Sequence, residues 1–165
     1  MTRRLLIQNE TGYDGRTVAG CVRYVFRELE LSGSGTVVKV KHHNGSHAYQ
    51  GRIYYQAHTH GRHVRSHGRG EWAWVAPSVP IGYRYLIVCR IGKPGTYPAE
   101  THVYDRRDSP GTWTVSDWGE ALVSITAHEA MHLRQYLAGR ARSETETEWA
   151  AYRLWQRWTQ RKPTT

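Results

Sequence analysis

Two histidines four residues apart, with a glutamate beside the first, form the motif in this 165-residue sequence best suited to chemistry. His128-Glu129-Ala130-Met131-His132 reads H-E-x-x-H and lies within a run that favours a long helix. Residues four apart project from one helical face, so both imidazoles can reach a single metal ion, for which zinc is the expected choice. Glu129 lies about 100° round the helix, where it can accept a proton from a metal-bound water.

A catalytic zinc site needs a third protein ligand and one open position. Downstream of the motif the chain offers three candidate carboxylates: Glu144, Glu146 and Glu148. The helix continues about 9 Å beyond His132, and a reversed second helix must climb about the same distance to return to that level. Counted from a cap at Ser143, Glu148 rises about 7.5 Å and Glu144 only about 1.5 Å. We therefore expect Glu148 as the ligand.

The other two carboxylates have alternative explanations. Glu144 precedes Glu148 by one turn, so it either supports the site from the same face or favours the helix dipole as an N-terminal charge. Glu146 completes a capping box with Ser143 and is expected to point away from the metal.

This order of elements resembles the zincin metallopeptidases, in which an H-E-x-x-H helix is followed by a short turn and a second helix that carries a carboxylate. A glutamate as third ligand is similar to the gluzincin branch, and the segment Glu148-Trp149-Ala150-Ala151 matches its E-x-x-A pattern. The resemblance covers roughly residues 117–158. It implies a zinc metallopeptidase that hydrolyses peptide bonds through a zinc-activated water, with zinc held by His128, His132 and Glu148 and with Glu129 as the general base.

The sequence also departs from two zincin patterns. Gln135 stands where the metzincin extension has glycine, and no third histidine follows. Tyr152 stands where thermolysin-like enzymes have aspartate. Tyr152 and Tyr136 are candidate donors to the oxyanion of the transition state, and each is alternatively a core aromatic residue. A peptide or protein substrate could add as a strand to a sheet edge, for which 100–105 is a candidate.

The charge of the chain suggests a different class of function. Its 23 Lys and Arg against 14 Asp and Glu give a net charge of +9, which attracts nucleic acid or other anions. The segment 58–70 combines three arginines, Arg62, Arg65 and Arg69, with His58, His60, His63 and His67. We expect a solvated basic loop that binds nucleic acid non-specifically. The alternative function is therefore a basic nucleic-acid-associated protein with a structural or degenerate zinc site, or a DNA-recruited protease.

Residues 1–165 are expected to form a single zincin-like metallopeptidase domain of the α+β class. Its core would be a mainly antiparallel twisted sheet with an N-terminal helix capped by Asp14, followed by the HEXXH active-site helix and a C-terminal ligand helix. Strands are predicted at 3–8, 36–43, 49–57, 83–91 and 100–105, with 36–43 and 49–57 paired as a hairpin around Asn44-Gly45.

The remaining features bear on compartment and assembly. Cys21 and Cys89 each lie in an apolar stretch, and two buried free thiols are typical of a reducing compartment. No apolar run approaches the roughly 20 residues of a membrane span, and the N-terminus does not resemble a signal peptide. We therefore expect a cytoplasmic monomer without a membrane partner.

Overall fold

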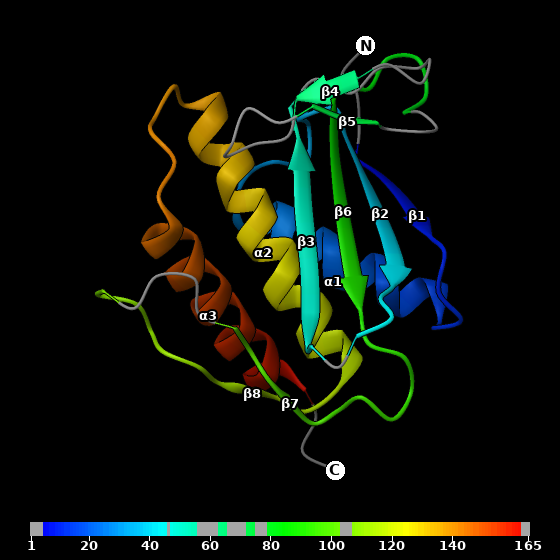
Figure 1. The fold of residues 1–165 in the computed structure, drawn as a ribbon, viewed down its shortest axis with the longest axis vertical. Helices are drawn as coiled ribbons and strands as arrows, with labels where there is room; N and C mark the ends of the chain where they lie inside the picture. The colour runs from blue at the N-terminus through cyan, green and yellow to red at the C-terminus, as the bar shows by residue number, and fades with distance from the viewer. Residues whose placement is uncertain are drawn as a thin grey trace.

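The computed structural model describes residues 5–45, 47–55, 79–102 and 107–162, together with the backbone of 63–65 and 72–74. These residues form three helices, a mixed four-stranded sheet and two short two-stranded sheets (Figure 1). In chain order the elements are β1 Leu6–Asn9, α1 Gly15–Glu28, β2 Thr36–His42, β3 Tyr49–Tyr54, β4 His63–Arg65, β5 Trp72–Trp74, β6 Tyr85–Ile91, β7 Ala99–Glu100, β8 Thr114–Val115, α2 Trp118–Leu137 and α3 Glu144–Arg161. The α+β class is therefore confirmed.

The main sheet is mixed, and the prediction of a mainly antiparallel sheet is wrong for it. Its strand order is β1-β2-β6-β3, with β1, β2 and β6 parallel and only β3 antiparallel. The physical reason is the crossover through α1, because a strand that returns through a helix lies parallel to the strand it left. Antiparallel pairing recurs in the small sheets β4-β5 and β7-β8.

The predicted hairpin between β2 and β3 does not form, because β6 lies between these two strands. Both strands pair with β6 along its length, and six residues separate the end of β2 from the start of β3. β6 reads YLIVCRI and is buried at six of its seven positions. A strand that is apolar on both faces buries most surface at the centre of a sheet, whereas polar positions in β3 suit an edge.

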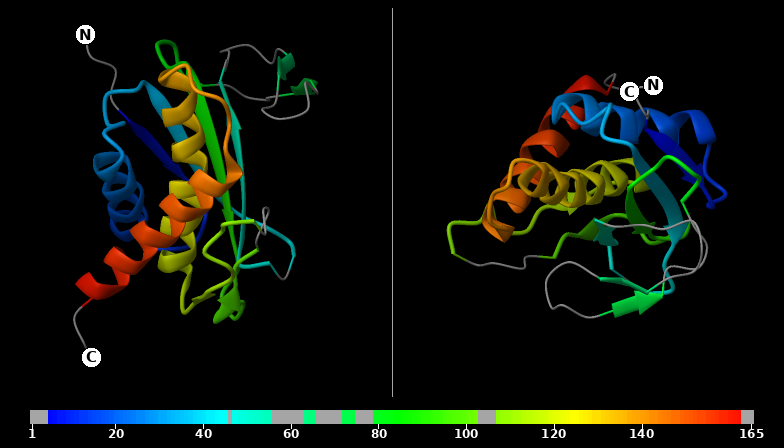
Figure 2. Two further views of the ribbon diagram at one scale, coloured as in Figure 1. Left: turned by 90° about the vertical axis from the view of Figure 1, so that its left-hand side faces the viewer. Right: turned by 90° about the horizontal axis from the view of Figure 1, so that it is seen from above.

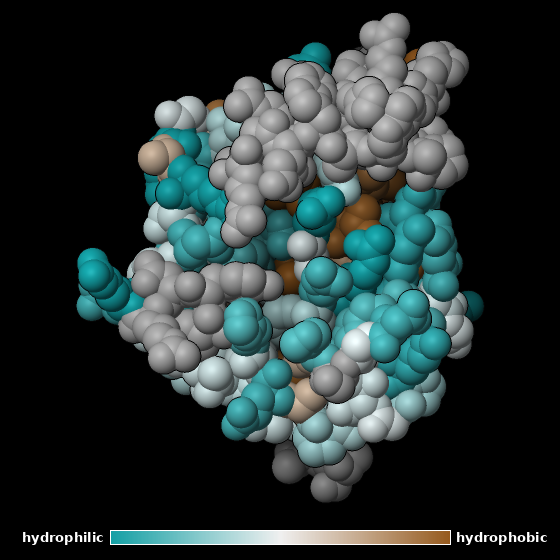
Figure 3. All heavy atoms as spheres, viewed as in Figure 1, coloured by the Kyte–Doolittle hydropathy of each residue, from teal (hydrophilic) through white to brown (hydrophobic). Residues whose placement is uncertain are grey.

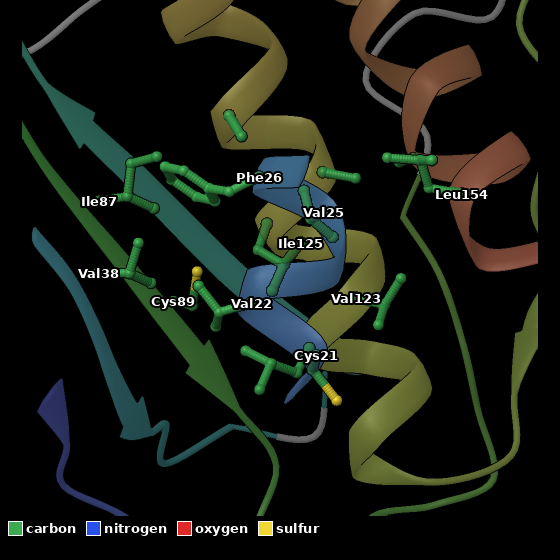
Figure 4. Packing of buried hydrophobic residues seen from close by; sticks show 14 of the residues in the cluster. Cys21, Val22, Val25, Phe26, Val38, Ile87, Cys89, Val123, Ile125 and Leu154 are labelled. Carbon is green, nitrogen blue, oxygen red and sulfur yellow. The ribbon is translucent and has the colours of Figure 1, made fainter. Parts of the chain in front are cut away.

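The three helices gather on one face of this sheet (Figure 2). Alternate strand residues such as Val38 and Ile87 point toward the helices and pack against Val22 and Phe26 of α1 (Figure 4). The intervening residues, among them Val37 and Val88, form a smaller apolar cluster on the opposite face. On the face shown in Figure 3, apolar residues are visible mainly near the middle, among hydrophilic ones.

α2 is the central helix, and 16 of its 20 residues are buried. It begins where predicted, because the Asp117 side chain accepts a hydrogen bond from the Glu120 amide at 2.9 Å. It is followed by Gly139 with φ +66°, the left-handed conformation expected after a helix end. The predicted caps of α1 and α3 are also confirmed, since Asp14 and Ser143 accept from the amides three residues on.

Two further predictions concern thiols and strands. Cys21 and Cys89 are free and buried, as expected. Among the described residues of the predicted strand 100–105, Glu100 alone lies in a strand, and this strand, Ala99–Glu100, pairs with β8 rather than with the main sheet. Residues 103–106 lie outside the described part of the chain. None of the described helices combines the length and apolar composition needed to cross a bilayer.

A buried carboxylate ties the end of α3 to the start of α2. Glu120 accepts hydrogen bonds from the Ser116 amide at 2.9 Å and from the Trp155 indole at 3.0 Å. The Lys162 ammonium bridges Glu120 at 2.8 Å and Asp117 at 2.6 Å. Burial alone would raise the pKa of Asp117, but hydrogen bonds from Lys162 and from the Glu120 amide lower it below 3.8. The C-terminus of the last helix is thereby anchored to the helix that carries the metal motif.

Lys162→Met is expected to lower the free energy of unfolding by about 1–2 kcal/mol at pH 7, because it leaves the buried Glu120 carboxylate without its cation. Lys162 also lowers the folded pKa of Asp117, which stabilises the fold above the unfolded pKa of that residue, and this stabilisation is lost as the pH falls through the folded pKa. The difference between variant and wild type should therefore shrink below about pH 4. Urea denaturation measures both effects. Lys93→Met, a change at an exposed lysine, is the control and should leave stability unchanged.

Candidate metal centre

The two histidines of the motif lie on one face of α2, and both are almost fully buried. Their rings are 5.0 Å apart between centroids. His128 is 6% exposed and His132 is 2% exposed. Burying two imidazoles in a helix packed on nearly all sides is costly unless each finds a polar partner.

Glu144, the first residue of α3, is the partner that the structure brings to both histidines. Its two carboxylate oxygens lie 3.2 Å from His128 Nε2 and 3.4 Å from His132 Nε2. The potential ligand atoms of these three residues all lie within 4.8 Å of one another. The two short distances join the imidazoles to different oxygens of Glu144, and the three residues together lie close enough to hold one metal ion.

The structure thus groups Glu144, rather than the predicted Glu148, with the histidines. Glu148 is buried one turn later in α3. The helix-rise argument assumed that the connection only reverses the chain and that α3 then climbs back. Instead, residues 140–143 are non-helical and run back beside α2 before α3 begins (Figure 1). Four extended residues cover about 13 Å, so the first residue of α3 is already level with the histidines.

Arg142 holds the Glu144 carboxylate from the solvent side. Its Nε donates to Glu144 Oε1 at 2.7 Å, and an Nη makes a second contact with the same oxygen. Burial alone would raise the pKa of Glu144, but hydrogen bonds from His128 and His132 lower it well below its usual range. Glu144 is therefore a carboxylate anion, which is the form that binds metals.

Glu129 lies beside this group, against the edge strand β3. It is 7% exposed. Burial raises its pKa, while the neighbouring charges of His128 and His132 oppose the rise. A β-carbon at Gly51 of β3 would stand 2.6 Å from Glu129 Oε1, which is too close for any other residue without displacement. The glycine therefore makes room for the carboxylate, a requirement that the sequence pattern did not reveal.

Gln135 joins the two helices of the site, a role that sequence analysis missed. Its Nε2 donates to the Ser143 carbonyl at 3.1 Å and to Glu146 Oε2 at 2.9 Å. Its Oε1 accepts from the Ser143 amide at 3.3 Å and contacts His132 Nδ1 at 3.2 Å. The signal was present in its position, since Gln135 follows His132 by three residues and shares its helical face.

This network also sets which ring nitrogen of His132 faces Glu144. The donors of Gln135 are committed to α3, so its oxygen must face the imidazole, and His132 Nδ1 must donate to it. Nε2, the other ring nitrogen, faces Glu144 and is the one that would bind a metal ion. Hydrogen bonding of the second ring nitrogen is the usual way in which proteins orient a metal-binding histidine.

The structure places Tyr152 and Tyr136 beside other aromatic rings. Tyr152 lies in an aromatic cluster with Trp113, Trp149 and Trp155, and its hydroxyl accepts a hydrogen bond from Gln156. Tyr136 is half-exposed and stacks on Tyr55 with ring centroids 4.3 Å apart. Tyr55 directly follows β3; burial first, and the charge of Glu129 second, raise its pKa. Tyr55 therefore lies close enough to Glu129 for the two groups to interact electrostatically.

The site thus unites His128, His132 and Glu144 as potential ligands, with Glu129 alongside and Gln135 behind. The histidines and arginines of the segment 58–70 lie outside the described residues, apart from the backbone of 63–65. Comparisons with protein-family models, with curated proteins and with solved structures found no match to this chain.

Substitution of each candidate ligand in turn tests which glutamate binds the metal. Glu144→Gln should weaken zinc binding by more than about 100-fold, because a metal-binding oxygen is lost, an effect larger than that of supporting residues. Glu148→Gln makes the same chemical change one turn further along α3 and should weaken binding less than about tenfold. Competition with a fluorescent zinc chelator measures both affinities. The opposite ranking would assign the ligand to Glu148.

Removal of the bridging amide tests the role of Gln135. Gln135→Leu should weaken zinc binding by about 10–100-fold, because His132 loses the acceptor that orients it. The change also removes two hydrogen bonds to the half-buried backbone of Ser143 and should destabilise the fold by about 1–3 kcal/mol. Gln156→Leu, which removes another side-chain amide of a helix, should leave zinc affinity unchanged. Wild-type affinity in Gln135→Leu would refute the positioning role.

Proposed function

We propose that this protein is a zinc-dependent metallopeptidase, with zinc held by His128, His132 and Glu144 and with Glu129 as the general base. The observation that carries the proposal is that one carboxylate meets two buried imidazoles: Glu144 lies 3.2 Å from His128 Nε2 and 3.4 Å from His132 Nε2, and the three residues are close enough to hold one metal ion. Two imidazoles and a carboxylate form a donor set that suits zinc.

The number of ligands favours a catalytic rather than a structural site. Structural zinc sites are closed by four protein ligands, whereas catalytic sites have three and keep one position for water or substrate. Within the described residues the ligand group has three members. Bound zinc would supply a Lewis acid that acidifies water and polarises a carbonyl group.

Glu129 would receive the proton during hydrolysis. Its burial raises its pKa toward the range in which a carboxylate can both accept a proton and return it to a leaving group. Because Gly51 has no side chain, the Glu129 carboxylate can pack directly against β3, beside the proposed ligands. A positioned base of this kind contributes about 10²–10⁴ to the rate.

The edge strand β3 offers a place for an extended peptide. In the described sheet β3 pairs only with β6, and its Gly51 lies against Glu129. A peptide paired with the outer edge of β3 would run past the base and the ligands. The described residues of the other candidate edge, 100–102, are not part of this sheet, so β3 replaces that edge in the proposal. Tyr55, at the end of β3, is a better placed hydroxyl donor than Tyr152.

Metal content and peptide hydrolysis test the proposal together. Purified wild type should contain about one zinc per chain, and His128→Ala/His132→Ala should contain none. Glu129→Gln should keep zinc and lose hydrolysis of a fluorescent peptide library by about 10²–10⁴-fold, because an amide cannot accept the proton. Gly51→Ala should likewise keep zinc and lose activity, because the added methyl displaces Glu129. Zinc without cleavage of any library peptide would contradict a peptidase, and loss of zinc in Glu129→Gln would contradict its role as base.

A further inference from the structure

A groove of about 590 Å³ lies among the three helices, separate from the metal ligands. Its walls come from the C-terminal end of α1, the C-terminal half of α2 with the connection that follows, and one face of α3. The lining includes none of the two histidines, Glu129 or Glu144. The proposed peptidase chemistry therefore does not account for it.

Arginine is the dominant charged residue of this groove. Four arginines line it: Arg134, Arg140, Arg153 and Arg157. Against them stand two glutamates, Glu28 and Glu146, so the lining carries an excess of two positive charges. Arg153 and Arg157 are four residues apart on α3, and like charges at this spacing repel unless an anion lies between them.

The ion pairs within the groove leave the arginines able to bind a ligand. Arg157 lies 3.5 Å from Glu28, and Arg140 contacts Glu146. Arg134 pairs at 4.0 Å with Glu30, outside the groove. Pairs this exposed contribute little in water, and each guanidinium has five N–H donors, so donors remain for a phosphate group.

An aromatic platform accompanies the charge. The Arg153 guanidinium lies over the Trp149 indole at 5.5 Å from the ring centroid. The indole itself is held in place by a hydrogen bond from its N–H to the Asp108 carbonyl at 2.5 Å. A planar guanidinium over an indole is a surface on which a nucleobase can stack.

We propose that this groove binds single-stranded nucleic acid, with phosphates on the arginines and a base stacked on the Trp149–Arg153 platform. The net charge of +9 supplies the long-range attraction that such binding needs. A peptide of aspartate and glutamate alone would satisfy the arginines but has no ring to stack on the platform. The proposal concerns a surface distinct from the metal site, so its test is independent of zinc and of peptide hydrolysis.

Fluorescence anisotropy with a labelled oligothymidylate of about 12 nucleotides tests the groove directly. Arg134→Gln/Arg153→Gln should weaken binding at least tenfold and reduce the slope of log affinity against log salt by about 1.4. Arg16→Gln/Arg23→Gln removes the same charge from exposed positions of α1 and should weaken binding less than about threefold. The single variants Arg134→Gln and Arg153→Gln should each weaken binding several-fold. They provide the test if the double variant does not fold.

Two further arms identify the ligand and the surface. An abasic strand with the same phosphate spacing should bind about tenfold more weakly, because it cannot stack. Equal binding of the abasic strand, or equal competition by polyglutamate, would overturn the assignment to nucleic acid. Loss of binding in Arg62→Ser/Arg65→Ser/Arg69→Ser but not in the groove variant would assign binding to the segment 58–70. No binding by wild type at low salt would also overturn the proposal.

Discussion

The burial of ionisable side chains in α2 is the constraint on which the site depends. A helix with 16 of 20 residues buried cannot hold two imidazoles and a carboxylate without polar partners at defined places. Glu144 from α3 meets both imidazoles, and a missing side chain at Gly51 leaves room for Glu129. The buried motif is therefore accommodated by α3, which supplies a polar partner, and by β3, which leaves space for a carboxylate.

Gln135 and Glu120 hold α3 in place from its two ends. Gln135 bonds the Ser143 backbone and Glu146, which sets the first turn of α3 where Glu144 faces the histidines. Glu120, through Trp155 and Lys162, fixes the last turns of α3 to the start of α2. Metal-binding side chains are positioned by surrounding packing and hydrogen bonds, and Gln135 and Glu120 supply such hydrogen bonds to α3.

Helix α3 has two functional faces in this interpretation. One end presents Glu144 to the proposed metal, and a side face presents Arg153 and Arg157 to the groove. Glu146 touches both regions, since it accepts from Gln135 and contacts Arg140. The proposed peptidase site and the proposed anion-binding surface would thus lie on one helix, but none of the metal ligands would line the groove.

The sequence by itself determined the helices, their caps and the two histidines with Glu129, because these features depend on residues within one or two turns of each other. It also indicated the α+β class and the buried, free thiols of Cys21 and Cys89. Strand order, the grouping of Glu144 with the two histidines, and the contacts of Gly51 and Gln135 depend on tertiary structure. β6 separates β2 from β3 because its two apolar faces are best buried at the centre of the sheet, an energy that local turn signals do not contain. The extended path of 140–143 carries the chain back to the level of the histidines, and hydrogen bonds between residues eight and eleven positions apart hold it there.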